Sequence, residues 1–342
     1  MIAALLACGG GAPPGPVKIT SEPFDTGGGA PTQTPDDTGG TGTDTPPTGT
    51  DCKNLPPLPM SWDYIVNVPS SDEFAFDSAG LMYNIDTAIG ELFATPYHGD
   101  PIRVGVYDAV AELGAIRVLP DGDLALADRS LSAIVRLDPE TAAASLLLPG
   151  VTDPLGMVVG PDAQLYLSSQ GQILRFDPAA PAAPELLLEL PGAELDGLTF
   201  SPDAGRLYFT NDTQLPGTGT VAFASSLDQL GLDRFGEPTQ SGTLSPIPTD
   251  PYTLLEGAAV DVCGNIYTLQ IDGQIRRIRP DGRLEPFVRL TSPEGVYTTA
   301  LRFGSGIGGW RRDRLYVMNQ LGGMFDVFVG IDGSPEPHWP QN

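Results

Sequence analysis

The sequence is poor in basic residues, and this scarcity excludes one class of function. Lysine and arginine together number 18 against 43 acidic residues, giving a net charge of −25 and an isoelectric point near 4.1. A nucleic-acid partner needs a basic face, so we expect none. The acidic excess is typical either of divalent-cation binding or of solubility alone, and composition leaves both open.

Histidine and long apolar runs are also scarce. The two histidines, His98 and His338, lie outside the segments that carry the motifs described below. We therefore expect neither a histidine-based mechanism nor a zinc site, and we expect His338 to be a surface residue in a polar tail, 335–342. No run of eighteen apolar residues occurs, so no membrane-spanning helix is predicted.

The chain has three cysteines, and the first ends a short apolar run. The segment Leu5-Leu6-Ala7-Cys8 resembles a bacterial lipobox, in which the cysteine is diacylated and becomes the new N-terminus. An accidental match is the alternative. We interpret residues 1–8 as a lipoprotein signal-like segment with lipidation at Cys8. Export to the outer membrane or cell surface follows, with membrane attachment only through this lipid.

Two further features fit an exported protein. Residues 9–59 consist almost wholly of Gly, Pro, Thr, Asp and Ala, a composition that cannot bury enough apolar surface to fold. We expect them to form a disordered linker. Once Cys8 is set aside, Cys52 and Cys263 remain as an even pair, which favours one disulfide. Two unpaired thiols are the alternative.

The chain has 42 glycines and 35 prolines, and one turn-rich phrase repeats along it. In residues 196–212 two short alternating strands, around Leu198 and Leu207, flank the turn Pro202-Asp203-Ala204-Gly205. The phrase occurs six times, with steps of 43, 41, 42, 59 and 49 residues between equivalent positions. Those positions are Leu81, Leu124, Leu165, Leu207, Ile266 and Leu315.

This period predicts the fold. Third strands follow most copies and fourth strands follow several, which is typical of an all-β, six-bladed β-propeller with four-stranded blades. We place it at residues 60–334. The long step predicts an insertion on the fourth blade at 227–251. The last blade lacks a fourth strand, so we expect residues 62–68 to supply it and close the ring.

Acidic residues precede several of the predicted innermost strands. In a propeller these positions converge on one mouth of the central channel, and here they hold Asp72, Asp196 and Glu256, with Thr299 in the sixth blade. Three converging carboxylates repel one another unless a cation lies between them. Oxygen ligands favour Ca²⁺ over Mg²⁺. The alternative is that these carboxylates cap turns and stay solvated.

The phrases around Asp196-Gly197 and Glu256-Gly257 resemble the senescence marker protein/gluconolactonase family and, more distantly, NHL-repeat propellers. The resemblance covers roughly residues 62–329. It implies six blades and a divalent cation, usually calcium, at the channel mouth. By position, the ligand sites fall on Asp196, on Glu256 and on Asp72 or the adjacent Glu73. Each differs in type from the family's residue but keeps an oxygen donor.

Two functions follow from the sequence. The first is a cell-surface lipoprotein that binds a protein, a glycan or a small molecule across its channel face without catalysis, with a cation at the mouth. The alternative, implied by the resemblance, is a calcium-dependent lactonase or ester hydrolase in which Glu256 is the acid–base group. The changed ligand types favour the first function.

Overall fold

The computed structural model describes residues 52–53, 55–58, 60–65, 67–107, 112–215, 223–248, 253–292 and 296–336. The chain divides into two compact units, Met1–Thr48 and Gly49–Asn342, and only the second contains described residues. The predicted lipidation site Cys8, most of the predicted linker and His338 therefore lie outside them. No α-helix in the described ranges has the length and apolarity needed to cross a bilayer.

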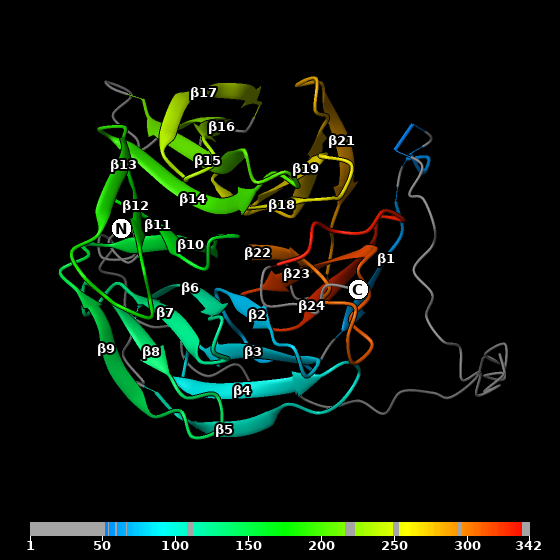
Figure 1. Ribbon diagram of the computed structural model, residues 1–342. Coiled ribbons are helices and arrows are strands. Elements are labelled where there is room, and N and C mark those ends of the chain that lie inside the picture. The colour runs from blue at the N-terminus through cyan, green and yellow to red at the C-terminus, as the bar shows by residue number, and fades with distance from the viewer. Residues whose placement is uncertain are drawn as a thin grey trace, which may run out of the picture. The chain divides into compact units, whose positions relative to one another are not determined.

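The second unit is a ring of six antiparallel four-stranded sheets around a channel (Figure 1), as the sequence period predicts. Blade 1 contains β2 (Phe74–Phe76), β3 (Leu81–Asp86), β4 (Glu91–Pro96) and β5 (Ile102–Val106). Blade 2 contains β6 (Leu113–Val118), β7 (Leu124–Asp128), β8 (Ala133–Leu137) and β9 (Ala144–Pro149). Blade 3 contains β10 (Pro154–Val159), β11 (Leu165–Ser169), β12 (Gln172–Phe176) and β13 (Glu185–Glu189).

The remaining blades follow the same order from the channel outward. Blade 4 contains β14 (Ala193–Phe200), β15 (Arg206–Gln214), β16 (Phe223–Leu232) and β17 (Pro238–Ile247). Blade 5 contains β18 (Leu255–Val260), β19 (Ile266–Gln270), β20 (Gln274–Ile278) and β21 (Leu284–Arg289). Blade 6 contains β22 (Thr298–Phe303), β23 (Arg314–Asn319), β24 (Met324–Phe328) and, from the start of the unit, β1 (Trp62–Ile65).

The hydrophobic core is divided among the interfaces between blades. Six clusters of buried side chains occur, and each joins two neighbouring blades. A second strand such as β7 or β11 packs on both faces, so every one of its residues is buried. An outer strand such as β13 is largely exposed instead, and only its Leu187 is buried. The second strands therefore contribute to the core, while the outer strands form much of the surface of each blade.

The N-terminal strand closes the ring, as predicted from the missing fourth strand. β1 pairs antiparallel with β24, with Trp62 opposite Val327 and Ile65 opposite Met324. The Tyr64 hydroxyl donates to the Gly322 carbonyl at 2.5 Å. Ahead of β1, a disulfide joins Cys52 to Cys263 in the turn between β18 and β19, with 5.4 Å between their Cα atoms. The N-terminal segment is thus joined to blade 6 by the pairing of β1 with β24 and to blade 5 by the disulfide.

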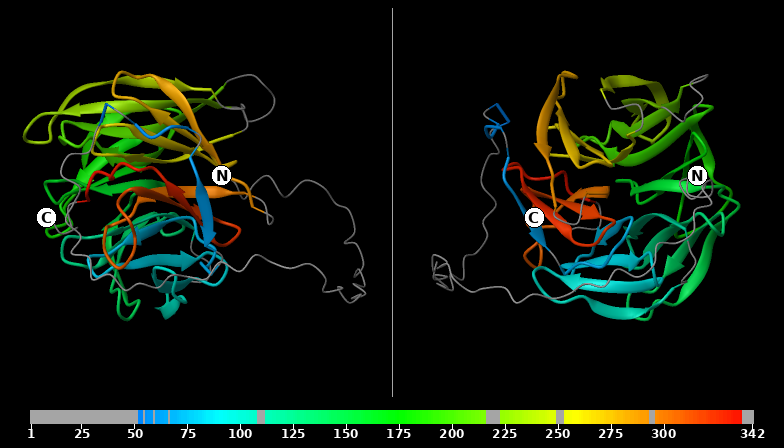
Figure 2. Two further views of the ribbon diagram at one scale, coloured as in Figure 1. Left: turned by 90° about the vertical axis from the view of Figure 1, so that its right-hand side faces the viewer. Right: turned by 180° about the vertical axis from the view of Figure 1, so that it is seen from behind.

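The fourth blade differs from the predicted insertion. The additional residues lengthen its outer strands, so that β16 and β17 each have ten residues and pair from Ser225–Ile247 to Leu232–Pro238. The third strand of this blade, β16, begins at Phe223. Most of β17 is exposed at a sheet edge, where a proline such as Pro238 is tolerated. Figure 2 shows this long hairpin from the side.

Candidate functional site at the channel mouth

Five of the six innermost strands have a β-bulge at an equivalent point near the start of the strand. The register breaks at Leu113/Ile116, Pro154/Met157, Asp196/Thr199, Leu255/Gly257 and Thr298/Ala300. A bulge adds one residue and turns its side chain in a new direction. The positions aligned in the sequence are therefore equivalent in the fold, and Asp196 and Glu256 occupy the same place on neighbouring strands.

The glycine that follows each acid has a packing cause. Gly197 has φ +55°, and a Cβ there would lie 2.7 Å from the backbone nitrogen of Ala258 on the next inner strand. A Cβ on Gly257 would lie 2.7 Å from a methyl group of Leu301. At Gly197 the backbone of the neighbouring inner strand approaches too closely for any larger residue, whereas at Gly257 the Leu301 side chain would have to move. The shared Asp-Gly and Glu-Gly phrases thus reflect strand packing as well as any ligand.

Glu256 is an acidic residue at this mouth whose carboxylate has no protein partner in the described part of the chain. No hydrogen bond or ion pair to its carboxylate occurs among the described residues. Burial raises its pKa well above the usual range, and the negative charges of Asp196, Asp212, Glu194 and Asp72 raise it further. Four other acids therefore lie close enough to repel the charge on Glu256.

Asp196 and Asp72 are perturbed in the same direction. Burial raises the pKa of Asp196 to about 8, against the lowering effect of the Gly197 N–H, which donates to its Oδ1 at 2.7 Å. Burial raises the pKa of Asp72 to about 6, and the Gln320 side chain, which donates to Asp72 Oδ1, opposes this shift. At neutral pH the mouth therefore holds a mixture of protonated and charged carboxyl groups.

Two further acids at this mouth were missed in the sequence. Glu194 and Asp212 are directly opposite each other in the pairing of β14 with β15. Burial raises both pKa values, that of Asp212 to about 6 although Ser225 and the Leu255 N–H donate to it. Glu194 precedes Asp196 by two residues on one strand, so strand periodicity could have placed it on the same face. Asp212 depends on the cross-strand register, which the sequence does not display.

Glu73 has a different role from the metal ligand considered above. Its carboxylate accepts hydrogen bonds from Arg117 of β6 and, at 2.8 Å, from Arg302 of β22. Arg302 also donates to the Phe74 carbonyl at 2.7 Å. The arginine side chains are only 5% and 10% exposed. Glu73 thus ties blades 6, 1 and 2 together inside the channel.

The predicted ligand set does not form a metal-binding group as it stands. Among the residues that the structure describes, no three His, Cys, Asp or Glu side chains are arranged to hold an ion. Hydrogen bonds hold each of three predicted ligands: Glu73 accepts from two arginines, Asp72 from Gln320, and Asp196 from its own Gly197. Only Glu256, of the four, is without such a contact.

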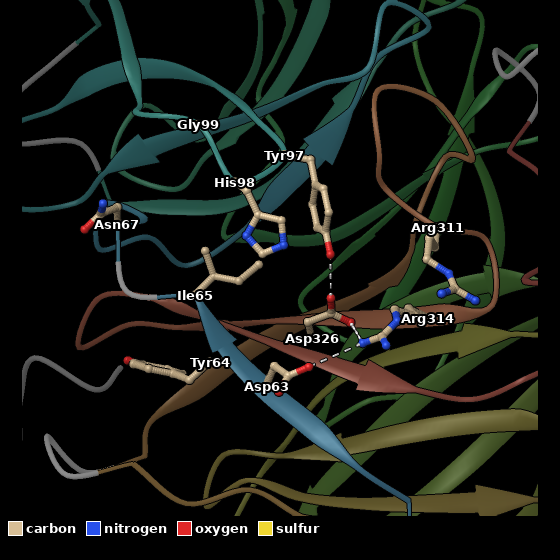
Figure 3. Close-up of a pocket in the computed structure, with 10 residues that line it drawn as sticks. All are labelled: Asp63, Tyr64, Ile65, Asn67, Tyr97, His98, Gly99, Arg311, Arg314 and Asp326. Atoms are coloured by element: carbon tan, nitrogen blue, oxygen red, sulfur yellow. Dashed lines mark hydrogen bonds and ion pairs between the residues drawn. The ribbon is translucent and has the colours of Figure 1, made fainter. Parts of the chain in front are cut away.

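A cavity of about 340 Å³ lies where β1 closes the ring, between blades 6 and 1 (Figure 3). In this cavity Asp326 accepts from Arg314 at 2.7 Å and from the Tyr97 hydroxyl at 3.1 Å. His98 lines this cavity with its ring against that of Tyr97. As predicted from its position in the chain, His98 is not one of the residues at the inner-strand starts.

Comparison with known proteins establishes the fold. No protein-family model matches the chain, and no characterised protein matches it in sequence. Among solved structures it resembles a gluconolactonase from Xanthomonas campestris, with TM-score 0.60 and 16% identity, covering 81% of this chain and 99% of that one. A luciferin-regenerating enzyme gives TM-score 0.62 and 15% identity, covering 81% and 98%.

A calcium-binding protein, regucalcin, from Agrobacterium tumefaciens gives TM-score 0.59 and 18% identity, covering 83% of this chain and 99% of that one. The expected likeness to gluconolactonase-like six-bladed propellers is therefore confirmed for the fold. At these identities the likeness carries no activity with it, since one fold hosts many functions.

Substituting Glu73 tests its bridging role. In Glu73→Gln two buried arginines would lose their shared negative charge, and we expect a loss of about 3–5 kcal/mol in the free energy of unfolding. Urea unfolding measures this loss. The control is Glu140→Gln, an exposed glutamate with no ion pair among the described contacts, with an expected change of about 0.5 kcal/mol or less. Equal effects of the two substitutions would contradict the assignment.

The raised pKa values predict the pH dependence of the cation-free protein. Because Asp72, Asp212 and Asp196 titrate near 6, 6 and 8 in the folded state rather than at 3.8, the folded state binds protons more tightly than the unfolded state. Their contribution to stability is therefore fully present below pH 3.8 and is lost as the pH rises to about 6 for Asp72 and Asp212 and to about 8 for Asp196. Urea unfolding in a chelating buffer at pH 5, 7 and 9 should show this decline, and Asp196→Asn should flatten it.

Proposed function

We propose that the channel mouth binds a divalent cation, Ca²⁺ by preference, through Asp196 and Glu256 with Asp72 beside them, and that the protein is a cation-dependent binding module. The observation that carries this proposal is the Glu256 carboxylate, which faces other acids across the mouth and has no partner among the described residues. A cation would offset this repulsion, which no basic side chain of the described ranges does for Glu256.

The donor set fits a hard cation in its chemistry. All the candidate ligands are carboxylate oxygens, which suit Ca²⁺ and Mg²⁺ and not the softer metals. The side chains would have to move toward one another on binding, because they are not arranged as a metal-binding group in the described residues. Ca²⁺ accepts this better than Mg²⁺, which requires near-ideal octahedral geometry.

The number of ligands indicates the kind of partner. Ca²⁺ takes about 6–8 oxygen ligands, and three carboxylates would leave positions open. Ligands with adjacent hydroxyl groups or a carboxylate, such as glycans and sugar acids, have the oxygens to fill them. We therefore propose a glycan or small polar molecule, rather than a protein surface, as the partner at this mouth.

Calcium titration by calorimetry tests the cation. We expect one Ca²⁺ per chain at pH 7, proton release on binding because carboxyl groups with raised pKa values must ionise, and a weaker response to Mg²⁺. Each of Asp196→Asn and Glu256→Gln should reduce the affinity by about tenfold or more, since each removes a charged ligand. The control Glu140→Gln should bind as the native protein does. Absence of binding at pH 8, where more of these acids are charged, would overturn the proposal.

A second candidate function is hydrolysis of a lactone or ester at the same mouth. The observation that favours it is the likeness in fold to a gluconolactonase, together with the raised pKa of Glu256. A bound cation would supply polarisation of the substrate carbonyl. In its ionised form Glu256 would accept a proton from the water that adds to the carbonyl, and it would then return that proton to the leaving ring oxygen.

A panel of lactones and aryl esters with added Ca²⁺ tests this second function. If the protein is a hydrolase, Glu256→Gln should reduce kcat by about a hundredfold or more while the variant keeps its fold, and Glu140→Gln should not. Turnover that is unaffected by Glu256→Gln would exclude the assigned role. No turnover combined with calcium binding would leave the binding module as the function.

We also propose export and attachment to the outer membrane or cell surface through a lipid on Cys8. The Cys52–Cys263 disulfide supports export, because structural disulfides persist in oxidising compartments. Expression in a bacterial host followed by membrane fractionation checks this, and Cys8→Ser should shift the protein from the membrane to the soluble fraction. Equal distribution of both forms would contradict lipidation.

A further inference from the structure

The channel has a second mouth, at the ends of the inner strands away from Glu256. A cavity of about 430 Å³ opens there, between the last residues of β10, β14, β18 and β22. Its walls are largely apolar and include Val159, Phe200, Val260, Leu301 and Phe303. Arg302 is the basic residue in its lining, and the segment Ser334–Glu336 lies against it.

The C-terminal segment is anchored at this mouth before it reaches the arginine. The Gly333 N–H donates to the Arg312 carbonyl and the Ser334 N–H donates to the Val260 carbonyl, both at 2.8 Å. A Cβ on Gly333 would lie 2.2 Å from Phe303, so this position requires glycine. Beyond the anchor, Glu336 accepts a hydrogen bond from Arg302 at 3.2 Å.

The charges around Arg302 show what Glu336 supplies. Arg302 and Arg117 share the single carboxylate of Glu73, and the Nε of Arg117 is buried without a hydrogen-bond partner in the described structure. Two guanidinium groups against one carboxylate leave one uncompensated positive charge in a buried position, which is costly. Glu336 neutralises it, and its negative charge helps to hold the pKa of Arg302 up.

We propose that this second mouth is a binding site for a small monocarboxylate with an apolar body, and that Glu336 is its internal occupant. The cavity remains open with Glu336 in place, so the carboxylate contact is filled while the apolar walls are not. A ligand with one negative charge balances the one uncompensated positive charge of the two arginines, whereas a doubly charged phosphate would leave an excess negative charge. An entering carboxylate replaces Glu336 on Arg302 and lays its hydrocarbon part against Phe200, Leu301 and Phe303.

Glu336 also competes with free ligand for Arg302 and so lowers the affinity of the site. Glu336 is only two residues beyond the Ser334 anchor, and a competitor tethered so closely acts at an effective concentration of about millimolar or more. Free ligand must therefore displace it, and affinity in the native chain is lower than the pocket alone would give.

Titration with benzoate, and with benzamide as its uncharged counterpart, tests the site by calorimetry and ligand-observed NMR. We expect weak benzoate binding to the native chain, binding about tenfold tighter or more in Glu336→Gln and in a chain ending at Ser334, and no binding of benzamide. Thr199→Phe fills the cavity and leaves every charged residue in place, so it should abolish benzoate binding. This variant tests the site without Arg302→Gln, which would remove a buried ion pair and endanger folding.

Two results would overturn the proposal. One is the absence of benzoate binding in both Glu336→Gln and the shortened chain, when both melt as the native protein does. The other is equal binding of benzamide and benzoate, which would show that the arginine does not select a carboxylate. Glu256→Gln, at the other mouth, should leave benzoate binding unchanged, so the outcome is separate from that of the calcium proposal.

Discussion

The ion pairs of Glu73 with Arg117 and Arg302 organise the channel. They connect three consecutive blades through buried side chains and place a fixed cluster of charges between the two mouths. Asp196 interacts electrostatically with this cluster from one side: besides the effect of burial, the charge of Glu73 raises the pKa of Asp196 and the charge of Arg117 lowers it. Glu336 contacts it from the other side through Arg302. One mouth is therefore rich in unneutralised acid, and the opposite mouth holds an excess positive charge that a carboxylate must balance.

The structural and chemical demands of the inner strands are met at the same positions. A glycine lets adjacent strands approach, the resulting bulge redirects a neighbouring side chain, and that side chain points to the channel mouth. In blades 2 and 3 the equivalent positions are Gly114 and Leu155, which carry no charge. The acids therefore gather on blades 1, 4 and 5 and do not form a symmetric ring around the mouth.

The ring itself depends on interfaces rather than on single blades. Each buried cluster spans two neighbours, so no blade completes its core alone, and Ile65 of β1 packs against the final interface, between blades 6 and 1. The aromatic rings of Phe76, Tyr97, Trp310 and Tyr316 pack in that final interface. The Cys52–Cys263 disulfide ties the segment that supplies β1 to blade 5, which limits how far this strand can separate from the ring.

The sequence by itself determined the repeat, the number of blades, the closing strand and the positions that converge on one mouth. These follow from local patterns, namely strand alternation, turn residues and a period near forty residues. Such patterns can be recognised without knowledge of long-range contacts. The sequence also pointed to Asp72, Asp196 and Glu256. It could not separate Asp72 from Glu73, because a one-residue difference reverses the direction of a side chain on a strand.

The tertiary structure decided which of these groups are paired and which are not. Arg117 and Arg302 are 185 residues apart in the chain, and only ring closure brings both to Glu73. The same holds for Glu336, which reaches Arg302 because the C-terminal segment docks across β18. Hydrogen bonds, ion pairs and burial set the pKa of a carboxyl group, and all three depend on contacts between residues that are distant in the sequence. The local sequence therefore identified the acids. Only the assembled ring determined that Glu256 has no partner among the described residues.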